Sequence, residues 1–190
     1  MDEPLLTTAT APLAGERRGT ALGLLTAAEA SRFAVDPTPE RFLAGRMLLR
    51  ELAAELTGLP LESITVTAAC PDCGREHGRP RADGVFVSLS HAGEFVIAAA
   101  RTAAPVGVDA ERRDVGLAAD RLAAIRLVAG GDGVEHWTRV EAVLKADGRG
   151  LRVDPAAVRI RHDRATLDGV GYALTDASDE EHVISIATRL

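Results

Sequence analysis

The sequence has few cysteines and no long apolar run. Its 190 residues include two cysteines, which are too few for a disulfide framework and are consistent with a reducing compartment. Every apolar run ends well before the roughly 18 residues that argue for a membrane span, and the acidic start MDEPLL is not followed by the apolar core of a signal peptide. We therefore expect a soluble, cytoplasmic protein.

Basic residues are outnumbered by acidic ones. Lysine and arginine together number 22 against 28 aspartates and glutamates, which gives a net charge of -6. A protein whose main partner is nucleic acid needs a basic excess to neutralise phosphates. We therefore expect no nucleic-acid partner and, without an apolar span, no membrane partner.

Lysine is almost absent from the chain. Lys145 is the single lysine beside 21 arginines. Two interpretations of this bias stand. Either function needs a compact ammonium here rather than a planar guanidinium, or chance left one lysine on a solvated helix face.

What the sequence does contain is an α+β pattern. Asp36-Pro37-Thr38-Pro39 supplies capping oxygens and a proline suited to a first helical turn, and apolar residues then recur at helical spacing up to Gly58. Residues 1–20 are expected to be poorly ordered or to form a strand. The other predicted elements are helices at 39–57, 117–128 and 134–147, strands at 64–68, 85–90, 95–100, 106–111, 158–161, 170–174 and 183–188, and a loop at 70–84.

The order of these elements suggests a duplication. Each half of the chain supplies a helix and then strands, so we expect two related lobes, at 1–103 and 104–190, with a site where the halves meet. No repeat at the level of individual residues proves the duplication.

Two pairs of charged residues have a spacing that suits chemistry. Asp109 and Glu111 are separated by one residue on a predicted strand, so both carboxylates point to the same side and suit a hard cation. Glu141 and Lys145 are four residues apart on a predicted helix, on the face that also carries Trp137. Taken singly, a solvated strand end and an ordinary helix salt bridge are the better explanations of these pairs.

The order of motifs along the chain is more specific than any one of them. The segments are VSLSHAGEFVIAA at 87–99, PVGVDAE at 105–111 and WTRVEAVLKADGRGL at 137–151, preceded by AGRMLLRELAAEL at 44–56 and HGRP at 77–80. This order resembles the surfactin-synthetase-activating type of 4'-phosphopantetheinyl transferases. The resemblance covers about residues 31–151.

The resemblance implies a reaction and its partners. Such enzymes use Mg2+, or Mn2+ in its place, to move 4'-phosphopantetheine from coenzyme A onto a serine of an apo acyl or peptidyl carrier protein, releasing 3',5'-ADP. The resemblance also implies an α+β pseudo-dimer with the active site at the interface of two lobes. We expect this chain to act as a monomer.

The resemblance also implies roles for individual residues. Asp109, Glu111 and Glu141 match the metal-binding carboxylates, and Glu141 and Lys145 the catalytic pair. The serine proton has three candidate acceptors, Glu141, a metal-bound water and Lys145, and the sequence does not choose between them. The residues matched to coenzyme A binding are Arg41, Arg79, Pro80, Ser90, His91, Asp109 and Lys145.

The chain also departs from the family pattern. Thirty-one residues separate Asp109 from Glu141, fewer than the family pattern leads us to expect, and the basic residues typical ahead of the first helix appear here as Thr26 and Glu29. A shorter segment at 112–136 implies a reduced lid. The alternative function is therefore a non-catalytic module of the same fold that binds coenzyme A or a carrier protein.

The loop CPDCGREH at 70–77 needs a separate interpretation. Cys70, Cys73 and His77 are three possible zinc ligands, but closed structural sites take four, and no second C-x-x-C or H-x-H motif follows. A thioredoxin-like redox motif would need a β-α context that is missing here. We interpret the loop as a turn that delivers Arg79, with a zinc-dependent interaction domain as the third possibility.

Overall fold

The computed structural model describes residues 3–82, 84–113 and 133–190. The fold is mixed α+β and divides into two compact units, Met1–Ala103 (unit 1) and Ala104–Leu190 (unit 2). The helix expected at 117–128 lies outside the described residues.

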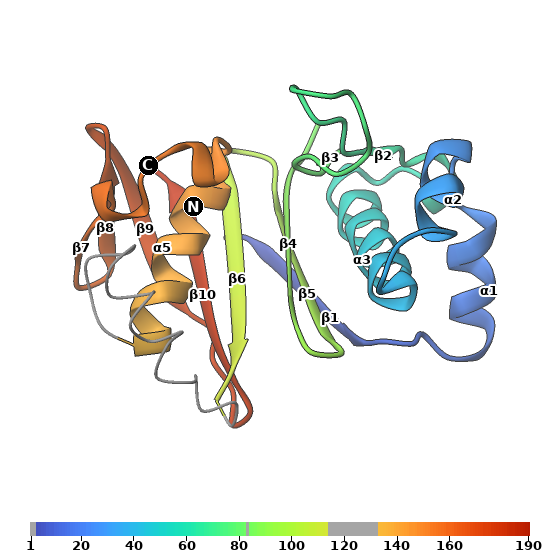
Figure 1. Cartoon of the computed structure of the whole chain (residues 1–190), viewed down its shortest axis with the longest axis horizontal. Helices are drawn as coiled ribbons and strands as arrows, with labels where there is room; N and C mark the ends of the chain where they lie inside the picture. Colours follow the sequence, from blue (N-terminus) through green and yellow to red (C-terminus); the bar gives the residue numbers. More distant parts are fainter. Residues whose placement is uncertain (1–2, 83, 114–132) are drawn as a thin grey trace. The chain divides into compact units, whose positions relative to one another are not determined.

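Unit 1 is built on a three-stranded antiparallel sheet (Figure 1). Its strand order is β1 (Leu5–Thr10), β5 (Phe95–Arg101) and β4 (Phe86–Ala92). β4 and β5 form the predicted hairpin, with Ala92 paired to Phe95 across the turn. The alternation of β1, exposed at every second residue, leaves one face of this edge strand to the core.

The helix α3 (Pro39–Thr57) covers this sheet and confirms the prediction at 39–57. Pro39 lies in its first turn, and Gly58 ends it with a left-handed φ of 70°. Leu43, Leu48 and Leu49 are fully buried in the core of unit 1. A Cβ at Gly45 would lie 2.6 Å from Leu89 Cδ2, so the missing side chain lets the helix approach β4 closely.

The first 35 residues are more structured than the sequence indicates. β1 is the strand allowed for at 1–20, but α1 (Gly15–Gly23) and α2 (Ala27–Phe33) were not predicted. α2 begins with a capping box, in which the Thr26 side chain accepts from the Glu29 backbone N–H and the Glu29 carboxylate accepts from the Thr26 backbone N–H.

Short elements connect these parts of unit 1. The 3-10 turn η1 (Leu61–Ser63) precedes β2 (Val66–Thr67), which is shorter than the strand expected at 64–68. β2 pairs with β3 (Arg81–Ala82), which lies within the segment expected to be a loop at 70–84. This pairing closes the intervening residues into a long loop.

Unit 2 is a five-stranded antiparallel sheet crossed by one described helix (Figure 1). The strand order is β6 (Val106–Arg112), β10 (His182–Arg189), β9 (Val170–Asp176), β8 (Arg164–Leu167) and β7 (Arg159–Arg161). α5 (Gly133–Asp147) packs on β6 and β10 and confirms the helix predicted at 134–147. β8 was not predicted as a strand, and the 3-10 turns η2 (Gly150–Arg152) and η3 (Pro155–Ala157) precede β7.

A glycine sets the closeness of α5 to the sheet. A Cβ at Gly107 would lie 2.0 Å from the carbonyl oxygen of Ala142 and 2.5 Å from the backbone nitrogen of Ala146. Only a residue without a side chain therefore fits between β6 and the backbone of α5. This close approach places side chains of β6 next to side chains of α5.

Candidate functional site

Asp109 and Glu111 lie on the same face of β6, as their spacing predicts. Asp109 is buried, with 6% of its surface exposed, while Glu111 near the end of the strand is half-buried. In the antiparallel ladder Asp109 pairs with Ser185 and Glu111 with Val183, so β10 fixes the register of both carboxylates.

Lys145 reaches from α5 to the same strand. Its Nζ donates to Asp109 Oδ1 at 2.7 Å and to the backbone oxygen of Val108 at 3.0 Å. The lysine side chain is 27% exposed and the aspartate side chain 8% exposed. The sole lysine is therefore not on a solvated helix face, because its ammonium is bound to β6.

Glu141 belongs to the same cluster. Burial raises the pKa of its carboxyl above the ordinary value, the negative charges of Asp109 and Glu111 raise it further, and the ammonium of Lys145 opposes them. The structure thus brings Asp109, Glu111, Glu141 and Lys145 together within unit 2. We call these four residues the carboxylate–lysine cluster.

The donor chemistry of this cluster fits a hard cation. Mg2+ prefers carboxylate oxygens and usually keeps several waters and substrate oxygens among its ligands, so a few protein carboxylates are enough. Burial is the main cause of the raised pKa of Glu141, and repulsion from Asp109 and Glu111 adds to it, a repulsion that a bound cation would relieve. The acids are not gathered as closely as in a formed metal site, since their ligand atoms do not all lie within 4.8 Å of one another.

Two residues expected to bind coenzyme A meet at one end of β4 in unit 1. Arg41, from the first turn of α3, donates to the backbone oxygen of Gly93 at 3.1 Å in the β4–β5 turn. His91, two residues before Gly93, is exposed. Its neighbour Ser90 is 5% exposed and lies on the other face of β4 from Val87 and Leu89, which pack in the core of unit 1. His91 and Arg41 therefore lie at the same end of β4.

Arg79 and Pro80 lie near the other end of β4. They line a cavity of about 350 Å³ with Phe86 and Val87, the first residues of that strand. At about 3.3 Å per residue, Phe86 and His91 are roughly 17 Å apart along the strand. The structure therefore does not gather Arg79 with His91, and a single ligand touching both must be extended.

Unit 1 contains a buried ion network that was not predicted from the sequence. Arg50 Nη2 donates to Glu29 Oε2 at 2.6 Å, and Arg46 Nε lies 3.3 Å from Glu29 Oε1. All three side chains are buried, Glu29 to 1% exposure. The capping-box spacing of Thr26 and Glu29 was a usable signal, as were two arginines on the apolar face of α3. Glu29 thus has a structural role here.

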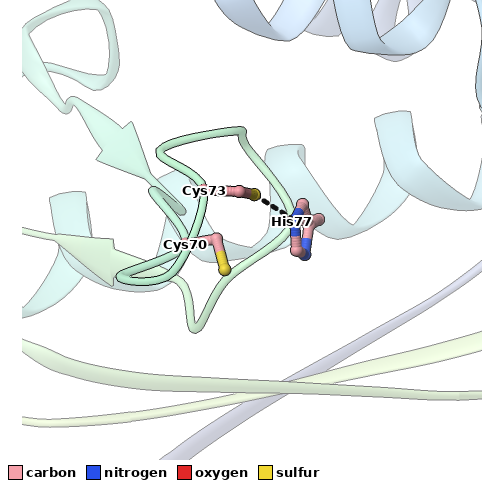
Figure 2. Close-up of side chains that lie close together, drawn as sticks. All are labelled: Cys70, Cys73 and His77. Carbon is pink, nitrogen blue, oxygen red and sulfur yellow. Dashed lines mark hydrogen bonds between the residues drawn. The ribbon is translucent and has the colours of Figure 1, made fainter.

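The cysteine loop forms the tightest cluster of potential metal ligands. Cys73 Sγ lies 2.9 Å from His77 Nε2, and within the described residues Cys70, Cys73 and His77 form the one group of three or more such side chains with all ligand atoms inside 4.8 Å (Figure 2). Hydrogen bonds, first of all from the Arg75 side chain, lower the pKa of Cys73 to about 6. Both cysteines are free, Cys70 buried and Cys73 exposed.

Comparison with known proteins gives no further assignment. No family model matches this chain, and the search of curated proteins finds no significant match. Within the residues that the structure describes, no helix is long and apolar enough to cross a membrane.

Proposed function

We propose that this protein transfers 4'-phosphopantetheine from coenzyme A to a serine of an apo acyl or peptidyl carrier protein, with Mg2+ and with release of 3',5'-ADP. The observation that carries the proposal is the carboxylate–lysine cluster. Three acids and the sole lysine come together from two elements, with the residues on β6 30 or more positions before those on α5. The motif order in the sequence supports the same reaction.

Phosphoryl transfer depends more on neutralising charge than on covalent catalysis. The serine oxygen forms a bond to the phosphorus that carries pantetheine, the bond from that phosphorus to the bridging oxygen breaks, and 3',5'-ADP leaves with the electron pair. Asp109, Glu111 and Glu141 would hold the cation, which would supply positive charge to the pyrophosphate. Binding, orientation and proton transfer are left to the protein's own side chains.

Lys145 supplies a second positive charge. Its ammonium is oriented by Asp109 Oδ1 and the Val108 carbonyl, and its positive charge can attract a phosphate oxygen at the same place. Glu141 lies one helical turn before it on α5, and a carboxylate can accept a proton in a general-base step. In the proposed reaction Glu141 takes the proton that the serine hydroxyl loses.

Arg41, Arg79 and His91 of unit 1 serve binding in this proposal. Arginine matches phosphate through two parallel hydrogen bonds, and coenzyme A carries phosphate at two places, the pyrophosphate and the 3' position. The separation of Arg79 from Arg41 and His91 along β4 suits contacts to different parts of one extended molecule. The proposal requires the residues of unit 1 and unit 2 to act on the same coenzyme A.

Mass spectrometry of an apo carrier protein tests the proposal directly. After incubation with this protein, coenzyme A and Mg2+, the carrier should gain the mass of one phosphopantetheine, and EDTA should abolish the gain until Mg2+ is restored. Glu141→Gln should lose nearly all transfer. Glu135→Gln, which changes an exposed acid on the same helix, is the matched control and should keep it.

The rival function is a non-catalytic module that binds coenzyme A or a carrier protein. The salt bridge between Lys145 and Asp109 favours it, because this contact occupies a carboxylate that the metal would need. Such a module would bind coenzyme A without modifying any carrier. Tight coenzyme A binding with no mass gain on several apo carriers would therefore replace the proposed function by this one.

A further inference from the structure

The loop from Cys70 to His77 is folded by its own backbone. The Gly74 N–H donates to the Cys70 carbonyl and the Cys70 N–H to the Arg75 carbonyl, both at 2.8 Å. Gly74 has a left-handed φ of 71°, which lets the chain turn back immediately after Cys73. The turn therefore brings residues at positions 70, 73 and 77 to one side of the loop (Figure 2).

The loop is also anchored to its surroundings. The Glu76 side chain accepts from the Ala68 N–H at 2.7 Å, and Gly78 N–H donates to the Ala68 carbonyl at 2.6 Å. The Arg32 side chain of α2 also donates to the Glu76 carbonyl. These contacts hold the backbone on both sides of His77, so the three side chains are positioned before any ligand arrives.

The spacing of the three ligand atoms suits a tetrahedral ion. Zinc bonds of about 2.3 Å to sulfur and 2.0–2.1 Å to nitrogen place tetrahedral ligands roughly 3.5–3.8 Å apart. Here the three atoms lie within 4.8 Å of one another, and the pair formed by Cys73 and His77 is at 2.9 Å. Side-chain adjustments on the order of 1 Å therefore convert the cluster into a coordination shell.

We propose that Cys70, Cys73 and His77 bind one zinc ion, with water or a ligand from the adjacent cavity in the fourth position. Thiolate and imidazole together are a ligand set that favours zinc over Mg2+, which prefers oxygen. Both cysteines bind zinc as thiolates, so any proton that a thiol still carries is released on binding.

A cavity beside His77 would give a further ligand access to the fourth coordination position. His77 lines a cavity of about 810 Å³ together with Arg32, Arg75 and Glu76. Three protein ligands with one exchangeable position are the pattern of zinc sites that bind further ligands, whereas closed structural sites use four.

Zinc at this loop is independent of the proposed transfer reaction. It would cross-link positions 70 and 77, just ahead of Arg79, without taking part in chemistry at the carboxylate–lysine cluster. The test therefore uses neither coenzyme A nor a carrier protein, and its outcome stands whether or not the transfer occurs.

The experiment measures metal binding by the full chain. Protein is reduced, stripped with a chelator and titrated with zinc against a chromophoric competitor, and in parallel with cobalt. We expect one zinc per chain and, with cobalt, the near-ultraviolet charge-transfer band of a thiolate ligand. Cys70→Ser, Cys73→Ser and His77→Gln should each weaken zinc binding by about 100-fold or more.

The matched control is His162→Asn, which removes an exposed histidine of unit 2 at a left-handed position that asparagine tolerates. It should bind zinc like the wild type. Circular dichroism checks that the variants fold, and the cobalt spectrum of the wild type tests thiolate ligation without any variant. Reduced wild type that binds no zinc, binding that survives in Cys73→Ser and His77→Gln, or cobalt without a thiolate band would each overturn the site.

Discussion

At the scale of single residues, Lys145 is the side chain whose surroundings say most about its role. The sequence left two interpretations, a functional ammonium or a chance lysine in a helix-surface pair with Glu141. The structure gives it a partner from another element instead, Asp109 on β6, at 2.7 Å and largely out of solvent. A contact of this kind, between elements and partly buried, constrains the ammonium far more than a pair on a solvated helix face.

Lys145→Arg tests whether the shape of this cation matters as well as its charge. A guanidinium keeps the charge and the helix propensity but meets Asp109 and a phosphate at a different distance and angle. We expect the transfer rate at saturating coenzyme A to fall about 10-fold or more, with the melting temperature and coenzyme A affinity nearly unchanged. Transfer at the wild-type rate would show that the lysine has no catalytic role.

Glu141 gives a prediction about stability and pH. Its pKa is raised in the folded protein, so its ionisation costs folding free energy. This carboxyl therefore contributes fully to the wild type's free energy of unfolding at pH values below the ordinary glutamate pKa. The contribution is lost as the pH rises through the raised pKa. Glu141→Gln does not ionise and should be the more stable protein at pH 7 without metal, by about 1 kcal/mol.

The measurement is urea unfolding of both proteins from pH 4 to pH 8 in EDTA. The stability difference should shrink toward pH 4 and grow toward neutrality. Added Mg2+ should then stabilise the wild type more than Glu141→Gln, because a cation that binds only the folded state adds to its stability. A difference that stays constant with pH would contradict the assignment of the raised pKa to this carboxyl.

At the scale of elements, the packing of α5 on β6 decides whether the cluster exists. Asp109 and Lys145 come from different elements, and their contact depends on the close approach that Gly107 allows. The sequence shows a glycine inside the strand segment PVGVDAE, where a glycine often marks close approach by another backbone. It does not say which backbone approaches.

Gly107→Ala should push α5 and β6 apart. The added Cβ would meet the backbone of α5 at Ala142 and Ala146, and backbone cannot give way as a flexible side chain does. We expect a loss of about 1–3 kcal/mol in unfolding free energy, the usual range for overpacking, together with a loss of transfer activity from the displaced cluster.

Gly19→Ala provides the matched control within a helix. A Cβ at Gly19 of α1 meets no atom within 4 Å, so alanine should leave stability unchanged or raise it by about 0.5–1 kcal/mol through helix propensity. Equal stabilities for Gly107→Ala and the wild type, measured by thermal and urea unfolding, would show that the helix accommodates the methyl group.

At the scale of the whole molecule, the proposed function divides labour between two compact units. Unit 1 carries five of the seven residues matched to coenzyme A binding, and unit 2 carries the carboxylate–lysine cluster, which includes the other two, Asp109 and Lys145. Variants in the two units should therefore have different kinetic signatures. Binding residues in unit 1 should act mainly on affinity, and cluster residues in unit 2 mainly on the rate of the bound complex.

Arg79→Ala tests this division. Loss of a charged hydrogen bond worth about 1.5–3 kcal/mol should weaken coenzyme A binding roughly 10- to 150-fold, as measured by calorimetry. If Arg79 contacts the 3'-phosphate, binding of dephospho-coenzyme A should change little. Equal losses for both ligands would move the contact to the pyrophosphate, and unchanged binding of both would remove Arg79 from the site.

The sequence by itself determined the elements whose patterns are local. The helix at 39–57 and the hairpin around Gly93 were predicted within a few residues, because caps, helical spacing and turn glycines act over short stretches of chain. Thr26 and Glu29, in contrast, were noted only as departures, although their spacing is that of the capping box that starts α2.

Only the tertiary structure decided which charges meet. Lys145 forms a salt bridge with Asp109 on another element, Glu29 is buried between two arginines of α3, and Cys73 lies against His77. The first two of these contacts join segments more than 15 residues apart, and the third depends on a turn closed by its backbone. Such contacts follow from how elements pack, and no local spacing rule contains that information.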